Sequence, residues 1–289
     1  MAVQRAVGGN TDLWLLEGGR TSRFTFDAAT DIRPTWSHDG TRIAFVSNRT
    51  GGYDIYQKRT SGAGLEERVV ASDQTKLPSS WSSDGRFLLF TNYNSSTGAD
   101  LWVVPMVGDR TPSLFLQTPF RERYGEFSPE GRWVAYESNE SMREEVYVRP
   151  FVPPTPEAST FASATADKSA DKAAGLPGAS TATATAGGQW QVSTAGGIHP
   201  AWRRDGKELY YLNPAGAMMA VPLAVAGGGL EPGAPVVLFP THIVGGGVDG
   251  GTGRQYDVAA DGRFLINTEL PGDAAPITLI QHWNPEAKP

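Results

Sequence analysis

The chain has 289 residues, of which 39% are hydrophobic and 10% aromatic, so it can bury a substantial core as one domain. Its 25 basic and 31 acidic residues give a formal charge of −6 without any basic run, which argues against nucleic-acid binding. Neither an apolar stretch of 18 residues nor an export leader is found, so we expect no membrane insertion, and the lack of cysteine excludes thiolate chemistry.

The sequence begins with three short segments, at 2–5, 12–17 and 22–26, whose apolar and β-branched residues favour strands. A phrase of 13 residues then occurs five times, as "RPTWSHDGTRIAF", "PSSWSSDGRFLLF", "YGEFSPEGRWVAY", "HPAWRRDGKELYY" and "QYDVAADGRFLIN". In each copy an acidic residue precedes a glycine and an apolar run follows; the glycines are Gly40, Gly85, Gly131, Gly206 and Gly262. The unit is about 45 residues long, with insertions in two of the intervals.

Each copy predicts a β-hairpin, because Asp-Gly between two apolar runs is a strong turn signal. Further strands are expected at 53–59, 99–105 and 144–150, with weaker counterparts at 217–223 and 277–283. Shorter ones follow at 67–70, 113–116, 189–192 and 235–239. No segment shows a helical period. Four strands per repeat of this length predict an all-β fold in which each repeat is one blade of a propeller.

Two of these repeats, "WSHDGTRIAFVSNRTGGYDIY" and "WSSDGRFLLFTNYNSSTGADLWVVP", resemble the repeat of TolB-like propellers, also called WD40-like or PD40 repeats. The stretches "FSPEGRWVAYESNE", "QWQVSTAGGIHPAW" and "LIQHWNPEAKP" resemble the C-terminal propellers associated with bacterial serine/threonine protein kinases. The resemblance spans nearly the whole chain apart from 153–188. It implies a six-bladed ring, a protein or peptide partner and an extracytoplasmic location.

The strand count at the two ends departs from that pattern, since the first blade and the last blade each offer three strands. We therefore expect a six-bladed propeller over residues 1–289 whose first and last blades are incomplete at the closure seam, with Met1 as a start inside a blade. Residues 153–188 consist mainly of Ala, Thr, Ser, Gly and Pro. They predict a disordered insert between the third and fourth strands of one blade, rather than a linker to a partner.

No catalytic signature is found: there is no nucleophile elbow, phosphate loop or zinc motif, and the four histidines are far apart. We expect no metal and no cofactor. The acidic residues of the repeated turn are explained by turn hydrogen bonds; they are Asp39, Asp84, Glu130, Asp205 and Asp261. Packing between blades explains the aromatic residues before them, which are Trp36, Trp81, Phe127 and Trp202. The glycine-rich segment 245–257 reads as a flexible connection.

Two positions of the repeat, seven and five residues before the glycine, vary in type from blade to blade. Such positions enter the innermost strand and are expected on the funnel face, where a ligand binds. The candidate binding residues, at these positions or directly before them, are Arg33, Arg123, Tyr124, Glu126, His199, Arg254 and Asp257. A ring of asparagines is expected instead to cap strand ends; it consists of Asn48, Asn92, Asn139, Asn213 and Asn267.

Two functions remain open at this point. The first is a non-catalytic recognition module that binds a protein segment or a small ligand at the funnel. The second is a propeller enzyme, such as a metal-dependent lactonase or lyase, built from Glu126, Asp257, His199 and His242.

Overall fold

The computed structural model describes residues 1–154, 188–227, 229–249, 251 and 253–268. These residues form antiparallel strands joined by turns and contain no helix, which confirms the predicted all-β class. It follows that no helix in this part of the chain is long and apolar enough to span a membrane. The predicted strand at 277–283 and most of the predicted insert at 153–188 lie outside the described residues.

The strands follow the predicted repeat closely. The N-terminal half contains β1 (Ala2–Val7), β2 (Asn10–Glu17), β3 (Arg20–Arg23), β4 (Asp31–Trp36), β5 (Arg42–Ser47), β6 (Asp54–Arg59), β7 (Glu67–Val70), β8 (Thr75–Trp81), β9 (Phe87–Asn94), β10 (Gly98–Pro105), β11 (Ser113–Leu116), β12 (Glu122–Phe127), β13 (Trp133–Ser138) and β14 (Glu145–Pro150). The rest contains β15 (Trp190–Gln191), β16 (Ile198–Trp202), β17 (Glu208–Leu212), β18 (Ala217–Ala226), β19 (Gly229–Pro232), β20 (Val236–Pro240), β21 (Tyr256–Val258) and β22 (Phe264–Ile266).

Consecutive strands pair into six sheets within the described residues. Three sheets have four strands in simple order, namely β4 to β7, β8 to β11 and β12 to β15. The N-terminal sheet has three strands, β1 to β3, and the last described sheet has two, β21 and β22. In the fifth sheet β20 takes the fourth place beside β18, and β19 pairs with the extended end of β18. That β19 hairpin was not predicted.

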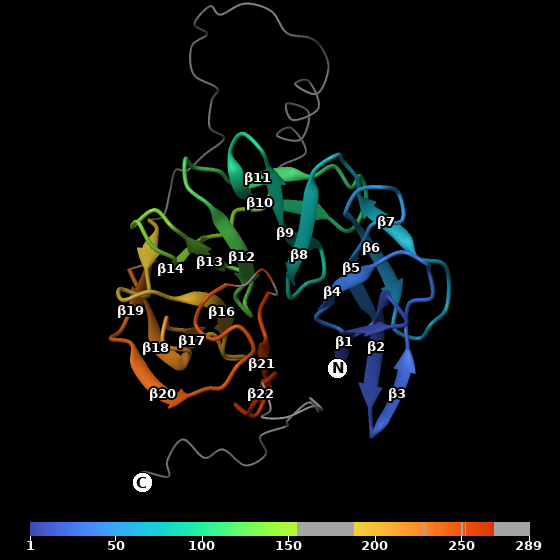
Figure 1. The fold of residues 1–289 in the computed structure, drawn as a ribbon. Coiled ribbons are helices and arrows are strands. Elements are labelled where there is room, and N and C mark those ends of the chain that lie inside the picture. Colours follow the sequence, from blue (N-terminus) through green and yellow to red (C-terminus); the bar gives the residue numbers. More distant parts are fainter. Residues whose placement is uncertain (155–187, 228, 250, 252, 269–289) are drawn as a thin grey trace, which may run out of the picture.

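The sheets surround a common centre in chain order, as Figure 1 shows. Their innermost strands contact one another in sequence: β4 lies against β8, β8 against β12, β12 against β16, and β16 against β21. Tyr147 of β14 pairs with Gln191 of β15, so the residues that flank the insert belong to adjacent strands, as predicted. The ends of the innermost strands therefore meet around the centre of the molecule.

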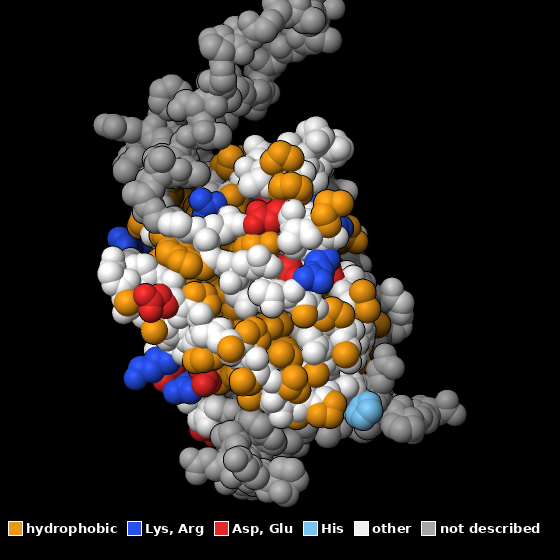
Figure 2. Space-filling model, turned by 90° about the vertical axis from the view of Figure 1, so that its left-hand side faces the viewer, with side chains coloured by type: hydrophobic (Ala, Val, Ile, Leu, Met, Phe, Trp, Pro, Cys, Tyr) orange, Lys and Arg blue, Asp and Glu red, His pale blue; other side chains and the backbone are white. Residues whose placement is uncertain are grey.

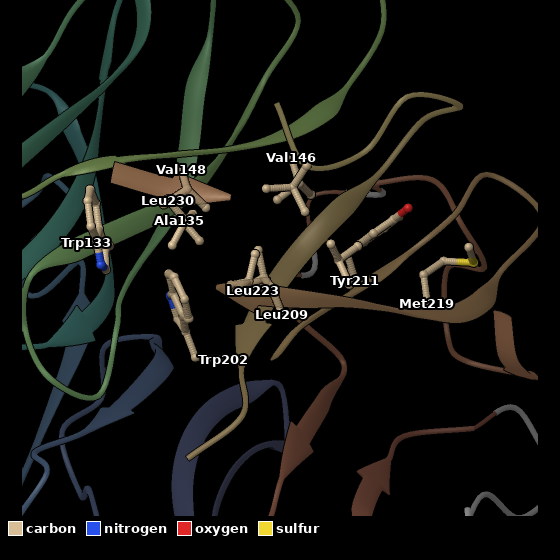
Figure 3. Packing of buried hydrophobic residues seen from close by; sticks show 12 residues of the cluster. Trp133, Ala135, Val146, Val148, Trp202, Leu209, Tyr211, Met219, Leu223 and Leu230 are labelled. Atoms are coloured by element: carbon tan, nitrogen blue, oxygen red, sulfur yellow. The ribbon is translucent and has the colours of Figure 1, made fainter. Parts of the chain in front are cut away.

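Apolar side chains fill the space between neighbouring sheets. Figure 3 shows the cluster between the sheet of β12 to β15 and the sheet of β16 to β20, in which Trp133 and Val148 face Trp202 and Leu209. Leu209 is fully buried, and burying an aliphatic side chain of this size contributes about 1.5 to 3 kcal/mol. Because each sheet is covered by the next one, the fold depends on these contacts between blades.

Hydrogen bonds from the repeated aromatic position also join the blades. The indole Nε1 of Trp81 donates to the carbonyl oxygen of Thr35 in the preceding blade at 3.1 Å, and that of Trp202 donates to the carbonyl oxygen of Glu126 at 3.1 Å. Where the repeat has Phe127, its backbone N–H instead donates to the Ser80 hydroxyl at 3.1 Å. The predicted packing role is therefore confirmed for Trp81, Phe127 and Trp202, whereas Trp36 is 37% exposed.

The repeated Asp-Gly turns are built from local hydrogen bonds, as predicted. Asp84 accepts from the Ser82 hydroxyl at 2.6 Å and from the backbone N–H of Arg86 at 3.0 Å, while Gly85 adopts φ 70°. The same set of bonds recurs around Asp39, whose pKa falls to about 2 because Ser37 and Thr41 donate to it. These carboxylates serve the turns.

The outer side of the fifth sheet exposes apolar side chains. Figure 2 shows hydrophobic residues spread over the side of the molecule that carries β18 and β20, with a few charged residues among them. Val236 and Val237 of β20 are more than half exposed. Another polypeptide segment can pack on such a surface or pair with an outer strand of this kind.

We expect Trp202→Phe to lower the free energy of unfolding by about 1 to 3 kcal/mol, because the carbonyl oxygen of Glu126 loses its buried donor. Trp36→Phe is the matched control, since this indole is 37% exposed and has no hydrogen bond among the described residues. Urea unfolding followed by fluorescence checks both variants. An equal loss in the two would show that the bond between blades contributes nothing.

Candidate funnel site

The innermost strands share a β-bulge at the position seven residues before the repeat glycine. The register with the second strand shifts between Ile32 and Thr35, and it shifts at the equivalent place in the three blades that follow. In three of these four bulges a residue other than glycine adopts a left-handed backbone: φ is 59° at Arg33, 50° at Tyr124 and 55° at His199. Such strained residues are uncommon and concentrate at functional sites.

A side chain from the preceding blade holds each of these strained residues. The backbone N–H of Arg33 donates to Gln4, that of Tyr124 donates to Thr91, and that of His199 donates to Glu137. Thr91 and Glu137 occupy the same place, six residues after the repeat glycine.

The bulge of β8 differs from the other three, because its residue is Pro78, which has no N–H to donate. The corresponding residue of the preceding blade is the apolar Val46. The second-strand residue is therefore polar where the bulge of the next blade has an N–H that needs an acceptor, and apolar where it has none.

The left-handed backbone brings three of the predicted residues together from separate blades. The Arg33 guanidinium lies 5.8 Å from the centre of the Tyr124 ring, which in turn meets the His199 ring edge-on at 4.9 Å. His199 is only 5% exposed. The cluster is thus a packed set of one cation, one phenol and one imidazole at the centre of the ring.

Arg123 supplies the second cation of this cluster. Its guanidinium lies 3.4 Å from Glu137 and 3.1 Å from Glu144, and it also pairs with Asp249. Burial opposes the positive charge, but the three carboxylates together raise the pKa of Arg123. A buried arginine shared by three acidic groups is held in one position by them.

Burial shifts the pKa values of two groups near Arg123, Glu137 and His199. It raises the pKa of Glu137 to about 8, although Arg123 acts in the opposite direction. It lowers the pKa of His199 to about 3, although the charge of Asp249 favours the protonated ring. His199 is therefore neutral at physiological pH.

Asp249, which the sequence reasoning missed, lies in the middle of the cluster. Its carboxylate accepts from the Tyr124 hydroxyl at 3.2 and 3.3 Å and pairs with Arg123, and it lies 3.9 Å from Nε2 of His199. The side chain is 4% exposed. Asp249 belongs to the connection between β20 and β21, which Figure 1 shows running into the centre of the ring.

Close contacts at two glycines hold this connection in place. A Cβ on Gly247 would lie 2.0 Å from the carbonyl oxygen of Asn213, and a Cβ on Gly253 would lie 1.7 Å from the Arg33 guanidinium. Arg33 also donates to the carbonyl oxygen of Gly251. The segment was predicted to be a flexible connection; its described glycines instead permit backbone to pack directly on the funnel residues.

The remaining predicted residues form a neighbouring cluster around Arg254. Its guanidinium pairs with Glu126, donates to the carbonyl oxygen of Pro200 at 3.0 Å and lies 3.6 Å from Asp257. Burial raises the pKa of Glu126, against the effect of Arg254. Asp257 is mostly exposed and marks the outer limit of this cluster.

The set named for an enzyme does not converge. Glu126 and Asp257 share Arg254, His199 lies against Glu137, and His242 is exposed on its loop. In the described part of the chain, no three His, Cys, Asp or Glu side chains are grouped so as to hold a metal ion.

Three of the five asparagines cap strand ends and turns, as predicted. Asn48 accepts from the backbone N–H of Thr30 at 2.9 Å, Asn139 accepts from that of Arg121 at 2.8 Å, and Asn213 accepts from that of Ala217 at 2.9 Å. Asn92 and Asn267 bond glutamine side chains instead.

Successive antiparallel sheets around a centre, with variable residues at one end of the innermost strands, define a β-propeller. Residues 1–150 match the family model described as the TolB beta propeller domain, which is half of the chain. The chain belongs to this family.

The curated relatives match only part of the chain. Tricorn protease homolog 1 of Streptomyces coelicolor is 30% identical over 109 residues, which are 36% of this chain and 10% of that protein. The Tol-Pal system protein TolB of Desulfosudis oleivorans is 33% identical over 69 residues, which are 24% of this chain and 15% of that protein. The chain thus spans a small share of the length of these relatives.

Solved structures with the same fold have different activities in their names. TolB from Acinetobacter baumannii is 14% identical with a TM-score of 0.55, covering 81% of this chain and 50% of that one. An oligogalacturonate lyase in complex with manganese is 13% identical with a TM-score of 0.53, covering 82% of this chain and 62% of that one. At this identity the similarity shows the fold alone.

We expect His199→Asn to reduce the loss of unfolding free energy as the pH falls below 6.5, because asparagine tolerates the left-handed backbone but does not titrate. The unfolded state binds a proton near pH 6.5 that the folded state binds only near pH 3. The wild type therefore loses up to about 1.4 kcal/mol per pH unit as pH falls through this window, and the variant is spared that loss.

Urea unfolding between pH 6.5 and pH 4 measures this slope. Glu137 is kept in both proteins, so its own titration is common to them. His242→Asn, at an exposed histidine, is the control and should keep the wild-type slope. A wild-type slope in His199→Asn would contradict the burial of a neutral imidazole.

Proposed function

We propose that this chain is a single-domain, six-bladed TolB-like propeller with incomplete first and last blades, which binds a protein or peptide partner at its funnel face without catalysing a reaction. The proposal rests on the cluster of Arg33, Arg123, Tyr124 and His199, which the strained bulges hold at the centre of the ring. Strain of this kind is retained where geometry serves a function.

The contrast between conserved and variable parts of the repeat supports this reading. Residues that serve the fold, such as Asp84 and Trp81, are bonded within their own turn or to the preceding blade. The bulge residues Arg33, Tyr124 and His199 lie against one another and differ in charge, size and hydrogen-bonding capacity. A site assembled from unlike residues suits one asymmetric partner.

The enzyme remains the second candidate because of one observation. Glu137 and His199 lie 3.2 Å apart, and burial moves their pKa values in opposite directions. Such pairs are found in active sites as well as in structural networks. The backbone N–H of His199 donates to Glu137, however, so the carboxylate already supports the strained backbone, and we favour the binding function.

Binding can be tested without knowing the natural partner. A displayed library of random dodecapeptides is selected on the full chain, and the affinities of the enriched peptides are measured by fluorescence anisotropy. We expect the combined change Arg33→Ala, Tyr124→Ala and Glu126→Ala to weaken them at least about tenfold, because it removes the cation, the phenol and the carboxylate of the funnel.

A matched double variant, Arg42→Ala with Val107→Ala, alters a pocket beside the Asp-Gly turns at the other end of the innermost strands. It should leave binding unchanged. If the peptides bind the funnel variant normally and this control poorly, the binding face is the opposite one. Turnover of a lactone or an oligouronate by the full chain, lost in His199→Asn, would favour the enzyme.

A further inference from the structure

The contacts of Asp249 are those of a bound carboxylate. The three groups that surround it, Arg123, Tyr124 and His199, come from β12 and β16, whereas Asp249 comes from the connection after β20. A guanidinium and a phenol hydroxyl are donors that proteins use to hold carboxylates. We call these three side chains the carboxylate socket.

Apart from the close contacts at Gly247 and Gly253, the described backbone around Asp249 is largely exposed. Val248 is 72% exposed, and Gly245, Gly246 and Gly251 are exposed as well. The carboxylate is thus buried by a segment whose neighbouring residues lie largely in water. Segments with few buried contacts open at low free-energy cost, so the occupant can leave while the blades remain intact.

The socket also has polar capacity that Asp249 leaves unused. In the described structure Nε of Arg123 is buried without a hydrogen-bond partner. Nδ1 of His199 makes no hydrogen bond either, but it faces Glu137 at 3.2 Å and lies away from Asp249. Buried polar atoms of this kind are rare in folded proteins, and each one requires a reason. A ligand larger than one aspartate side chain would supply a partner for Nε of Arg123.

We propose that the carboxylate socket is a binding site for an acidic peptide group, and that Asp249 occupies it in cis until a partner's carboxylate displaces it. The proposal rests on the proposed function and adds the chemical class of the ligand. It also makes Asp249 an internal competitor, so that the affinity measured for a partner is lowered by the fraction of molecules in which Asp249 is bound.

The neighbours of the socket favour a carboxylate over a phosphate. Arg123 already lies 3.1 Å from Glu144, and the carboxylate of Glu144 would repel a ligand with two negative charges. The bound Asp249 shows that one carboxylate fits, with 4% of its side chain exposed. An aspartate, a glutamate or a carboxyl terminus of a partner has the required single charge.

Chemical rescue tests the socket itself. Asp249→Ala removes a group of the size of acetate, so acetate should raise the melting temperature of this variant by on the order of 2 °C in a saturable manner. Acetamide, and sodium chloride at the same ionic strength, should not. The wild type, whose socket is filled, and the double variant Asp249→Ala with Arg123→Gln should show no acetate-specific shift.

Displacement is tested with a fluorescein-labelled Gly-Gly-Asp-Gly-Gly amide and its Asn counterpart. We expect the Asp peptide to bind Asp249→Ala at least about tenfold more tightly than the wild type, and the Asn peptide to bind neither. Asp249→Asn keeps the volume and removes the charge. It provides the same comparison if the alanine variant fails to fold by circular dichroism, with a smaller gain expected.

The outcomes separate this inference from the proposed function. If a folded Asp249 variant shows neither acetate rescue nor a gain for the Asp peptide, the socket is a structural ion pair and the inference is wrong. If library peptides bind the funnel but are not acidic and are indifferent to Asp249, the proposed function stands without it. Acetate rescue without any gain for the Asp peptide would overturn the role of Asp249 as a competitor.

Discussion

A backbone N–H that a left-handed residue turns out of its own sheet must find an acceptor, and in this propeller the preceding blade provides it. Gln4, Thr91 and Glu137 accept from the bulges at Arg33, Tyr124 and His199. The bulge therefore depends on the blade before it. The hydrogen bond of the bulge N–H thus joins two blades, and it fixes where the variable side chains lie.

Charge burial at the centre follows from this arrangement. The acceptor for His199 is a glutamate, which brings a carboxylate beneath Arg123, and the arginine in turn holds Glu144 and Asp249. Each buried charge has an opposite charge beside it, as the low dielectric requires. The result is a centre of paired, buried side chains that is covered by a glycine-rich connection.

Much of the fold could be predicted from the sequence because its signals are local. The Asp-Gly turns, the strands on either side of them and the aromatic at Trp81 and Trp202 repeat with fixed spacing, and each makes the expected bonds. The candidate positions around Tyr124 could be predicted because they vary while the turn does not. Their left-handed backbone could not, since nothing in the residue type of Arg33 or Tyr124 requires it.

Asp249 was beyond sequence reasoning for a different reason. Its partner Arg123 lies 126 residues earlier, and no repeat pattern links the two. The sequence did contain a signal for Glu137, which lies six residues after the repeat glycine. Glu137 is polar, and it accepts from the backbone N–H at the bulge of the next blade. The equivalent residue Val46 is apolar, and the bulge residue of the blade after it is a proline, which has no N–H.

The central claim is that Asp249 is bound electrostatically by the funnel, and a double-mutant cycle on Arg123→Gln and Asp249→Asn tests it most directly. Urea unfolding at pH 7 gives the free energies of unfolding of the wild type, both single variants and the double variant. Our account predicts a coupling energy of about 1 kcal/mol or more between the two residues, as expected for a buried ion pair. Effects that add to within about 0.3 kcal/mol would contradict it.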